Sequence, residues 1–392
     1  MRLAIPSLVF CLYIAASLIA FAPCRPLVKV AAGVALLVIS QKYLIYERIG
    51  GSFIAPDLPY ALLLTLEILY AFMIILAFLL VVKDGLALVL WLSRWLGSSW
   101  HLPSTPGIRS GGLVLAALIL SMYGTWQSLR VPDVRTIEVT LPRLPARLDG
   151  FSIVQLTDIH IGPFLKGDWL RGVVARSNAL SPDLVAVTGD MIDGSPAELK
   201  DDVAPFADLQ ARYGVFGVTG NHEYYFRVED WLPAFEQLGI TMLQNEHRIL
   251  SVAGGVELVV AGVPDQAGLH YGGAGPDIDR ALAGAPDTVR VLLAHRPNGI
   301  AEKIDADLQL SGHTHGGHLF FLKWLISSFN GGLVKGLYVP GGRVLHVSPG
   351  TGVWSGFSCR LGVPSEITRI ILRSQGKGLV SDRDGQSSSR QF

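Results

Sequence analysis

Cysteine is scarce in this chain of 392 residues, which holds only Cys11, Cys24 and Cys359. Because the three are odd in number and far apart, the sequence excludes a disulfide framework and a cysteine-rich metal knuckle. Charge is also scarce: 16% of the residues are charged, and 32 Lys and Arg balance 32 Asp and Glu. Without an excess of basic residues, we expect no nucleic-acid partner.

The few charges are unevenly distributed along the chain. The first 130 residues hold 13 of them, and the remaining 262 hold 51 together with nine of the ten histidines. Half of all residues are hydrophobic, and the mean hydropathy is +0.42. These values exclude a disordered chain and are not typical of a soluble enzyme. We therefore expect two modules in different solvents, an apolar one followed by a globular one.

The apolar module, residues 1–130, contains runs long enough to cross a bilayer, which takes about 20 residues. Four candidate spans are residues 3–24, 27–46, 58–82 and 110–129. Residues 85–97 are apolar but short, so we interpret them as an interfacial segment or as an extension of the third helix. The sequence thus predicts an all-α, multi-pass transmembrane module in the cell membrane. A cleaved signal peptide is the alternative for the first run.

Three charged residues in these runs need an interpretation. Lys29 and Lys42 lie near the ends of the second run, where we expect them to snorkel towards the interface. Glu67 lies inside the third run and is either a proton or ion site, or a carboxyl kept neutral or paired within the bundle. Basic residues are nearly equal on the two sides of the module. The side of the membrane that holds the C-terminal domain therefore stays open.

The rest of the chain divides into three segments. Residues 131–149 are expected to form a linker and an edge strand, and the polar residues 376–392 a disordered tail. Between them, residues 150–375 alternate apolar strands with helical patterns, which is typical of an α/β domain. Further strand patterns without helices between them indicate a second sheet, and hence a sandwich.

Polar side chains follow five of the expected strands directly. They are Asp158 and His160; Asp190 and Asp193; Asn221, His222 and Glu223; His295; and His313 and His315. One such cluster alone is typical of a capped turn. Five in order place Asp, Asn and His at the carboxyl edge of a sheet, where α/β folds bind ligands. Imidazole and carboxylate groups suit Mn²⁺, Fe²⁺, Zn²⁺, Co²⁺ or Ni²⁺, and the lack of cysteine argues against a structural zinc site.

The spacing within these clusters indicates how they would bind metal. Residues two apart in an extended segment point to the same side, so Asp158 and His160 are expected to grip one ion together. His313 and His315 share a side in the same way and can splay towards two ions. Asp190, central in the series, is the natural carboxylate to bridge two cations. We therefore predict a centre of two divalent metal ions.

The series D-x-H, G-D-x-x-D, G-N-H-E, H and G-H-x-H resembles the calcineurin-like metallophosphoesterase superfamily over residues 131–373. The flanking sequences SGHTHGGH and PSEIT are similar to those of a bacterial membrane-associated subgroup of phosphodiesterases and phosphohydrolases. That subgroup includes UDP-diacylglucosamine pyrophosphatases. A Gln often follows GHTHGG there, whereas this chain has His318.

The resemblance implies a four-layer α-β-β-α sandwich and a role for each motif residue. One metal ion would be held by Asp158, His160, Asp190 and His315, and the other by Asp190, Asn221, His295 and His313. His222 would not bind metal but would protonate or stabilise the leaving group. We expect Asp193 and Glu223 to orient ligands, and His318 either to touch substrate or to cap a loop.

Together these features predict a membrane-anchored, metal-dependent phosphohydrolase that cleaves a phosphodiester or a pyrophosphate. A lipid-linked substrate is one option. The alternatives are a non-catalytic membrane sensor or transporter that binds phosphoryl ligands, and a phosphomonoesterase or protein phosphatase. Residues 320–338 are unusually apolar and form either a buried helix or a lip that dips into the membrane interface. The natural substrate, the metal identity and the oligomeric state stay open.

Overall fold

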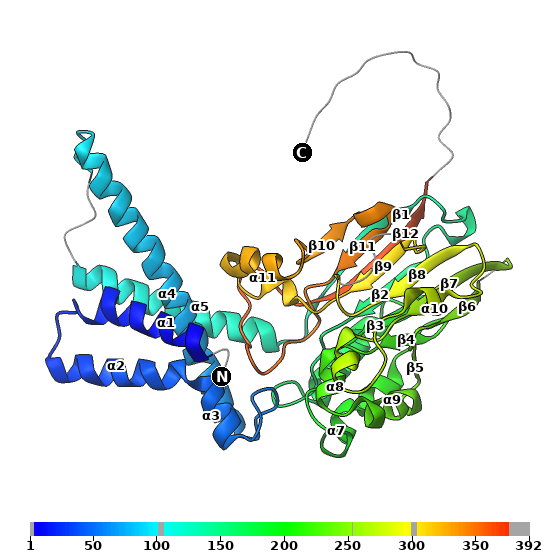
Figure 1. Cartoon of the computed structure of the whole chain (residues 1–392), viewed down its shortest axis with the longest axis horizontal. Helices are drawn as coiled ribbons and strands as arrows, with labels where there is room; N and C mark the ends of the chain where they lie inside the picture. Colours follow the sequence, from blue (N-terminus) through cyan, green and yellow to red (C-terminus); the bar gives the residue numbers. More distant parts are fainter. Residues whose placement is uncertain (1–3, 101–105, 253, 299–303, 376–392) are drawn as a thin grey trace, which may run out of the picture.

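The chain has a helical part and a β-rich part, which lie at opposite ends of the molecule in Figure 1. The computed structural model describes residues 4–100, 106–252, 254–298 and 304–375. The predicted tail, residues 376–392, lies outside the described residues.

The N-terminal part is helical. Its helices are α1 (Ala4–Ile14), continued by a π-helical turn (Ala15–Ile19), α2 (Pro26–Ser40), α3 (Lys42–Ile49), α4 (Tyr60–Trp95) and α5 (Pro106–Leu129). Among the described residues, only α4 and residues Ser110–Leu129 of α5 are long and apolar enough to cross a membrane by themselves. The pair α2 and α3 adds a third candidate, although the two helices are bent by 59°.

This arrangement differs from the four predicted spans. The first run forms only a short apolar helix, and the second is broken at Gln41. The expectation that Lys42 snorkels is wrong, because its ammonium is buried and lies 2.7 Å from Glu67 Oε1. A buried charge in an apolar bundle needs such a partner. Of the two alternatives for Glu67, the structure therefore supports a carboxyl paired within the bundle. Of the two interpretations of residues 85–97, an extension of the third helix is confirmed, since α4 continues through most of them.

The β-rich part contains two six-stranded sheets. The first has the order β1-β12-β2-β3-β4-β5 and the second the order β10-β11-β9-β8-β7-β6. The strands of the first sheet are β1 (Asp133–Leu141), β2 (Ser152–Leu156), β3 (Leu184–Thr188), β4 (Val215–Val218), β5 (Ile240–Met242) and β12 (Glu366–Ser374). Those of the second are β6 (Glu246–Val252), β7 (Val256–Gly262), β8 (Val289–Leu293), β9 (Leu308–Ser311), β10 (Gly336–Tyr338) and β11 (Val344–Val347).

Helices cover the outer faces of both sheets. Apolar side chains of the two inner faces, such as Ile153 and Val260, form one core between the sheets. A second core joins the first sheet to α6 (Gly167–Asn178), α7 (Pro196–Val203) and α9 (Val228–Gln237). A smaller one joins the second sheet to α10 (Ile278–Leu282). The predicted four-layer α-β-β-α sandwich is confirmed. Because the central strands are buried on both faces, they read as continuous apolar runs in the sequence.

Short helices and turns connect these layers. They are α8 (Asn221–Tyr225), α11 (Lys323–Phe329) and 3₁₀ turns at Ala146–Leu148, Ala204–Asp208, Gln266–His270, His315–Gly317, Phe320–Leu322 and Pro340–Gly342. The strands β2 to β5 run parallel, and so do β7, β8, β9 and β11. The carboxyl ends of the parallel strands in each sheet therefore meet at one edge, where loops can gather side chains.

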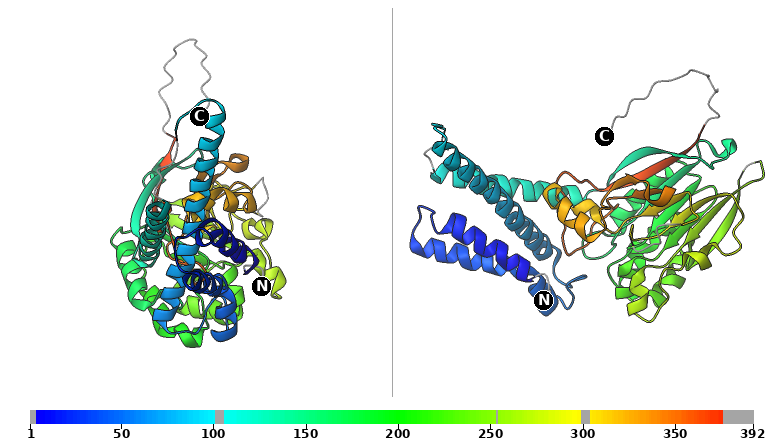
Figure 2. Two further views of the ribbon diagram at one scale, coloured as in Figure 1. Left: turned by 90° about the vertical axis from the view of Figure 1, so that its left-hand side faces the viewer. Right: turned by 45° about the horizontal axis from the view of Figure 1, so that its top comes forward.

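Several contacts join the helical part to the sandwich. β1 follows α5 almost directly and lies at the edge of the first sheet, where it pairs in parallel with β12. The apolar segment around α11 also contacts the helices. The ring of Phe321 stacks on Phe78 of α4 with centroids 3.9 Å apart. Figure 2 shows α11 on the side of the sandwich that faces the helices.

Candidate metal centre

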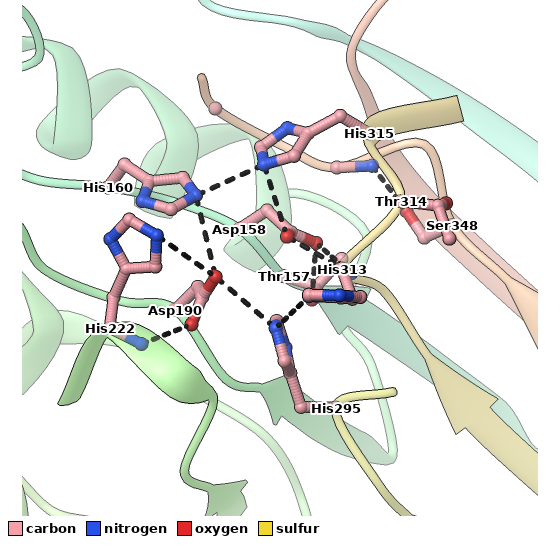
Figure 3. A network of polar contacts seen from close by, with 12 residues as sticks. Thr157, Asp158, His160, Asp190, His222, His295, His313, Thr314, His315 and Ser348 are labelled. Carbon is pink, nitrogen blue, oxygen red and sulfur yellow. Dashed lines mark hydrogen bonds and ion pairs between the residues drawn. The ribbon is translucent and has the colours of Figure 1, made fainter. Parts of the chain in front are cut away.

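Six predicted metal ligands lie together where strands of both sheets end (Figure 3). They are Asp158 and His160 after β2, Asp190 after β3, His295 after β8, and His313 and His315 after β9. These side chains fall into groups of three whose donor atoms all lie within 4.8 Å of one another, which is close enough to share a metal ion.

The first group consists of Asp158, His160 and His315. Nε2 of His315 lies 3.2 Å from Nε2 of His160 and 3.4 Å from Oδ1 of Asp158. All three residues are buried. Two imidazole nitrogens and a carboxylate oxygen that converge in this way are a donor set that fits a borderline divalent cation.

The second group consists of Asp190, His295 and His313. Nε2 of His295 lies 3.2 Å from Oδ2 of Asp190 and 3.2 Å from Nδ1 of His313. The same Asp190 oxygen is 3.8 Å from Nε2 of His160 in the first group. Asp190 therefore lies between the two groups, in the place that a bridging carboxylate requires. His313 and His315 separate into different groups, as their splayed arrangement predicts.

The backbone reaches this arrangement through left-handed residues. The φ angles are 51° at Asp158, 53° at His160, 52° at Asp190, 71° at His313 and 47° at His315. Residues other than glycine seldom adopt such values, which cost about 1–3 kcal/mol each and cluster at functional sites. The expectation of an extended Asp158–His160 segment is therefore wrong. The side chains converge because the chain turns sharply as soon as each strand ends.

Two glycines make room for the carboxylates. A Cβ atom on Gly220 would lie 2.1 Å from Oδ1 of Asp190, and one on Gly312 would lie 2.2 Å from Oδ2 of Asp158. Neither distance is possible for a real side chain. The glycines that precede the ligands in G-N-H-E and G-H-x-H are thus required by the close approach of neighbouring loops.

His222 lies at the edge of the first group and is held by Asp193. Oδ1 of Asp193 is 2.5 Å from Nδ1 of His222 and 3.2 Å from Nδ1 of His160. One carboxylate thus orients two imidazoles. Both Nε2 atoms lie 3.8 Å from Oδ2 of Asp190. Glu223 acts on the backbone instead. Its carboxylate accepts from the amides of Asp190, at 3.0 Å, and Gly220, at 2.6 Å, so it ties two ligand loops together.

Asn221 lies beside the second group. Its side-chain oxygen accepts a hydrogen bond from Arg296, at 3.2 Å, and Arg296 also lies 2.9 Å from Nε2 of His313. Asp265 in turn accepts from Nε of Arg296 at 2.9 Å. The amide of Asn221 is therefore held at the mouth of the centre by a guanidinium that is itself fixed.

Charges within the centre shift the histidine pKa values in opposite directions. Burial lowers the pKa of His222 and of His295, but nearby carboxylates outweigh it and raise the two values to about 9 and about 10. Burial also lowers the pKa of His313 and His315, which have cationic neighbours, and leaves both well below the usual range. Asp190 faces several imidazoles, which outweigh its burial and hold its pKa well below the ordinary value.

Comparison with known proteins agrees with this centre. Residues 151–317 match the model of the calcineurin-like phosphoesterase family. A bovine (Bos taurus) transmembrane protein with metallophosphoesterase domain is 34% identical over 342 residues, which cover 82% of this chain and 76% of the relative. The chain belongs to the calcineurin-like metallophosphoesterase family. Its class of activity is that of the phosphoric ester hydrolases, and the family uses divalent metal ions.

Two further proteins are similar to this metallophosphoesterase. An uncharacterized metallophosphoesterase of Campylobacter jejuni is 36% identical over 67% of this chain and 70% of its own. The solved structure of Haemophilus influenzae NAD nucleotidase is 19% identical, covers 51% of this chain and 50% of that one, and has a TM-score of 0.36. The name of the bovine relative describes a transmembrane protein that carries a metallophosphoesterase domain, and this chain likewise has apolar helices before its phosphoesterase domain.

Metal binding to this metallophosphoesterase should release a proton from His295. In the metal-free protein its pKa is raised to about 10, so the ring is protonated at neutral pH, whereas a metal ligand must be neutral. We expect about one proton per centre to be released from His295, and this release should disappear as the pH rises through that value. Calorimetric titration of Mn²⁺ in buffers of different ionisation enthalpy measures it. An unchanged proton count in His295→Ala would contradict the assignment.

His318 and Arg360 pack against the ligand His315. The His318 ring stacks on that of His315 with centroids 4.8 Å apart, and its Nδ1 is buried without a partner among the described residues. Arg360 is buried and donates to the carbonyl of His315 at 3.0 Å. His318 therefore has a ring nitrogen that a bound substrate could contact. Arg360 instead holds the backbone of His315, a predicted metal ligand.

A cavity of about 740 Å³ opens at the centre. Seven of its lining residues belong to the metal motifs or follow them, namely Asp190, Asn221, His222, His313, Thr314, His315 and His318. The rest of its wall is formed by Phe53, Ile54, Tyr225, Tyr271, Ile326, Asn330, Trp354 and Phe357. Sequence reasoning missed five of these, namely Phe53, Ile54, Tyr271, Trp354 and Phe357. They come from loops far from the metal motifs, and no local pattern marks them.

Proposed function

We propose that this metallophosphoesterase is a multi-pass enzyme of the cell membrane that hydrolyses a phosphodiester or pyrophosphate in a lipid-linked substrate. The observation that carries the proposal is the cavity. It joins the candidate metal centre to an apolar wall, and Phe53 and Ile54 of that wall belong to the loop between α3 and α4. A cavity lined by both polar and apolar side chains fits an amphiphile, which carries both a phosphate and an apolar chain.

The segment around α11 supports a membrane-borne substrate. Trp324 is 71% exposed and Phe329 is 74% exposed, although both are large and apolar. Ile326 and Asn330, from the same segment, line the cavity. An exposed apolar patch beside membrane-spanning helices is typical of a surface that enters the interface. The predicted lip would therefore connect the lipid phase to the cavity.

The residues of the centre have distinct chemical tasks in this proposal. The predicted ligands would hold two divalent ions, whose chemistry is to neutralise phosphoryl charge and to activate water. His222 lines the cavity, with its Nδ1 on Asp193 and its Nε2 3.8 Å from Oδ2 of Asp190, so Nε2 could donate a proton to a leaving oxygen. Its pKa of about 9 keeps it protonated at neutral pH, because the pull of Asp190 and Asp193 exceeds the effect of burial.

The direct test uses purified full-length protein with Mn²⁺. We expect hydrolysis of bis(p-nitrophenyl) phosphate to exceed that of p-nitrophenyl phosphate, and a chelator to abolish both. Preference for the monoester would favour a phosphomonoesterase or protein phosphatase. Tight binding of inorganic phosphate without turnover of either compound would favour a sensor or transporter.

The lip should matter for lipid-embedded substrates alone. Replacing Trp324 and Phe329 by Asp removes the apolar surface, and each buried methylene is worth about 0.8 kcal/mol. We expect kcat/KM on a diester in phospholipid vesicles to fall at least about tenfold, with no change on a soluble aryl diester. Phe321 is left intact because it packs on Phe78. Ile249→Asp, an exposed apolar position on β6, is the control and should change neither rate. A proportional fall on both substrates would mean that this segment is not a lip.

A further inference from the structure

Lys42 and Glu67 form an ion pair inside the helical part. Their side chains are 0% and 1% exposed, and Nζ of Lys42 lies 2.7 Å from Oε1 of Glu67. The hydroxyl of Tyr46 donates to the same oxygen at 2.8 Å. Burying two charges is costly, and their attraction alone seldom repays it. A pair retained in such a place calls for a role other than stability.

Both members of this pair also form hydrogen bonds to the β-rich part of the chain. Lys42 donates to the carbonyl of Gly356 at 2.7 Å, and the hydroxyl of Tyr43 donates to it at 2.8 Å. The amide of Ser358 donates to Oε2 of Glu67 at 2.8 Å. Gly356 and Ser358 lie in the loop between β11 and β12. One buried pair on α3 and α4 therefore holds the backbone of a loop that is distant in sequence. Gly356 lies 314 positions after Lys42, and Ser358 lies 291 positions after Glu67.

The side chains of the same loop reach the candidate metal centre. The ring of Trp354 lies 6.0 Å from that of His222, and the ring of Phe357 lies 5.3 Å from that of His318. Arg360 donates to the carbonyl of His315 at 3.0 Å and lies 3.1 Å from its Nδ1. Within residues 354–360, backbone groups thus bind the helices while side chains flank the centre.

A second contact holds the far end of this loop. The amide of Arg360 donates to the carbonyl of Gly124 in α5 at 3.0 Å. A Cβ atom on Gly124 would lie 2.5 Å from Sγ of Cys359, so the helix and the loop are in closest contact there. The loop is therefore fixed by three helices, α3, α4 and α5.

We propose that Lys42 and Glu67 are positioning residues of the catalytic centre. By fixing Gly356 and Ser358, the pair keeps Trp354 against His222 and Arg360 on His315. The helical part is then a component of the active site as well as an anchor. The inference rests on the proposed function only for its kinetic readout, because the position of the loop can be measured without turnover.

The test replaces both partners, Lys42→Met with Glu67→Leu, in the full-length protein. Replacing a buried pair by apolar residues often leaves stability unchanged, so the fold should persist while the two hydrogen bonds from the pair to the loop are lost. We expect an unchanged Tm, a fall in kcat on a soluble aryl diester of at least about tenfold with KM little changed, and faster amide exchange. The exchange is measured at Ser358 and across residues 354–360 in the metal-free protein.

The matched control is Lys83→Met with Asp84→Leu. This pair is also on α4, but Asp84 accepts from Tyr13 and Ser17 within the helical part. We expect it to change neither kcat nor loop exchange. If the Lys42–Glu67 double variant keeps wild-type kcat and slow exchange, the pair only packs the helices and the inference is wrong.

A second variant decides the matter if the first does not fold. Gly124→Ala pushes Cys359 away from α5, and we expect the same loss of kcat and of amide protection. Adding Cys359→Ala restores the space and should recover both. Wild-type behaviour of Gly124→Ala would overturn the inference. Lack of any phosphodiesterase activity in the wild type would remove the proposed function, yet the exchange measurement would still test the loop.

Discussion

Asp190→Asn should abolish most of the activity and lower the metal content of the protein. Oδ2 of Asp190 lies 3.2 Å from His295 and 3.8 Å from His160, so its charge serves both groups of ligands. Asparagine keeps the shape and the oxygen that accepts from the amide of His222, at 2.9 Å, but removes the charge. Loss of an outer-sphere partner already costs about 10–100-fold in metal affinity, so we expect a loss of more than about 100-fold here.

Metal analysis of the purified variant together with its phosphodiesterase rate checks this result. Asp183→Asn is a suitable control, because Asp183 lies just before β3, at the end of the strand away from Asp190, and its carboxylate accepts from Ser152. That variant should keep its metal and its rate. If Asp190→Asn retained full metal stoichiometry and full activity, the assignment of the centre would be wrong.

His222→Ala should also lose rate but, unlike Asp190→Asn, should retain the metal. General acids contribute about 10²–10⁴-fold, and we expect a loss in this range for a substrate with a poor leaving group. The loss should shrink as the leaving group becomes more acidic, because such a group needs no proton. Steady-state rates on a series of aryl phosphodiesters, with metal analysis of the variant, measure both effects.

The pH profile gives a second test of the same role. The pKa of His222 is raised to about 9, so the ring is protonated below that pH and loses its proton above it. That value applies to the metal-free protein, and bound cations would lower it, so activity of the metal-loaded wild type should fall as the pH rises through a value at or below about 9, and His222→Ala should lack this alkaline limb. His247→Ala, whose ring contacts the carbonyl of Ala281, is the control. In the series of aryl phosphodiesters, an equal loss of rate in His222→Ala for leaving groups of very different pKa would rule out His222 as a general acid.

The candidate centre could be predicted largely from the sequence because its ligands are local to strand ends. An apolar strand such as 184–188 followed at once by Gly189 and Asp190 places the carboxylate at the sheet edge, whatever the rest of the chain does. The same pattern at His295 and His313 brings the other ligands to that edge. The left-handed backbone could not be predicted in this way. It results from loops of two sheets crowding together, where Asp190 lies against Gly220.

The predictions for the membrane part show the limit of such reasoning. Hydropathy identifies apolar runs, and it located α4 and α5 because length and composition suffice for a long helix. It placed Lys42 at an interface because it treats each run alone. The side chain instead turns inward to Glu67, which lies on another helix.

Local pattern and tertiary packing thus account for different parts of this protein. The residue series by itself specified the sandwich, the candidate metal-ligating side chains and the apolar character of the first 130 residues, since each depends on neighbours in sequence. Only the folded chain brings Phe53, Trp354 and Phe357 to one cavity and joins Lys42 to Gly356. Contacts between such distant positions arise from the packing of whole layers and helices, which no short stretch of sequence encodes.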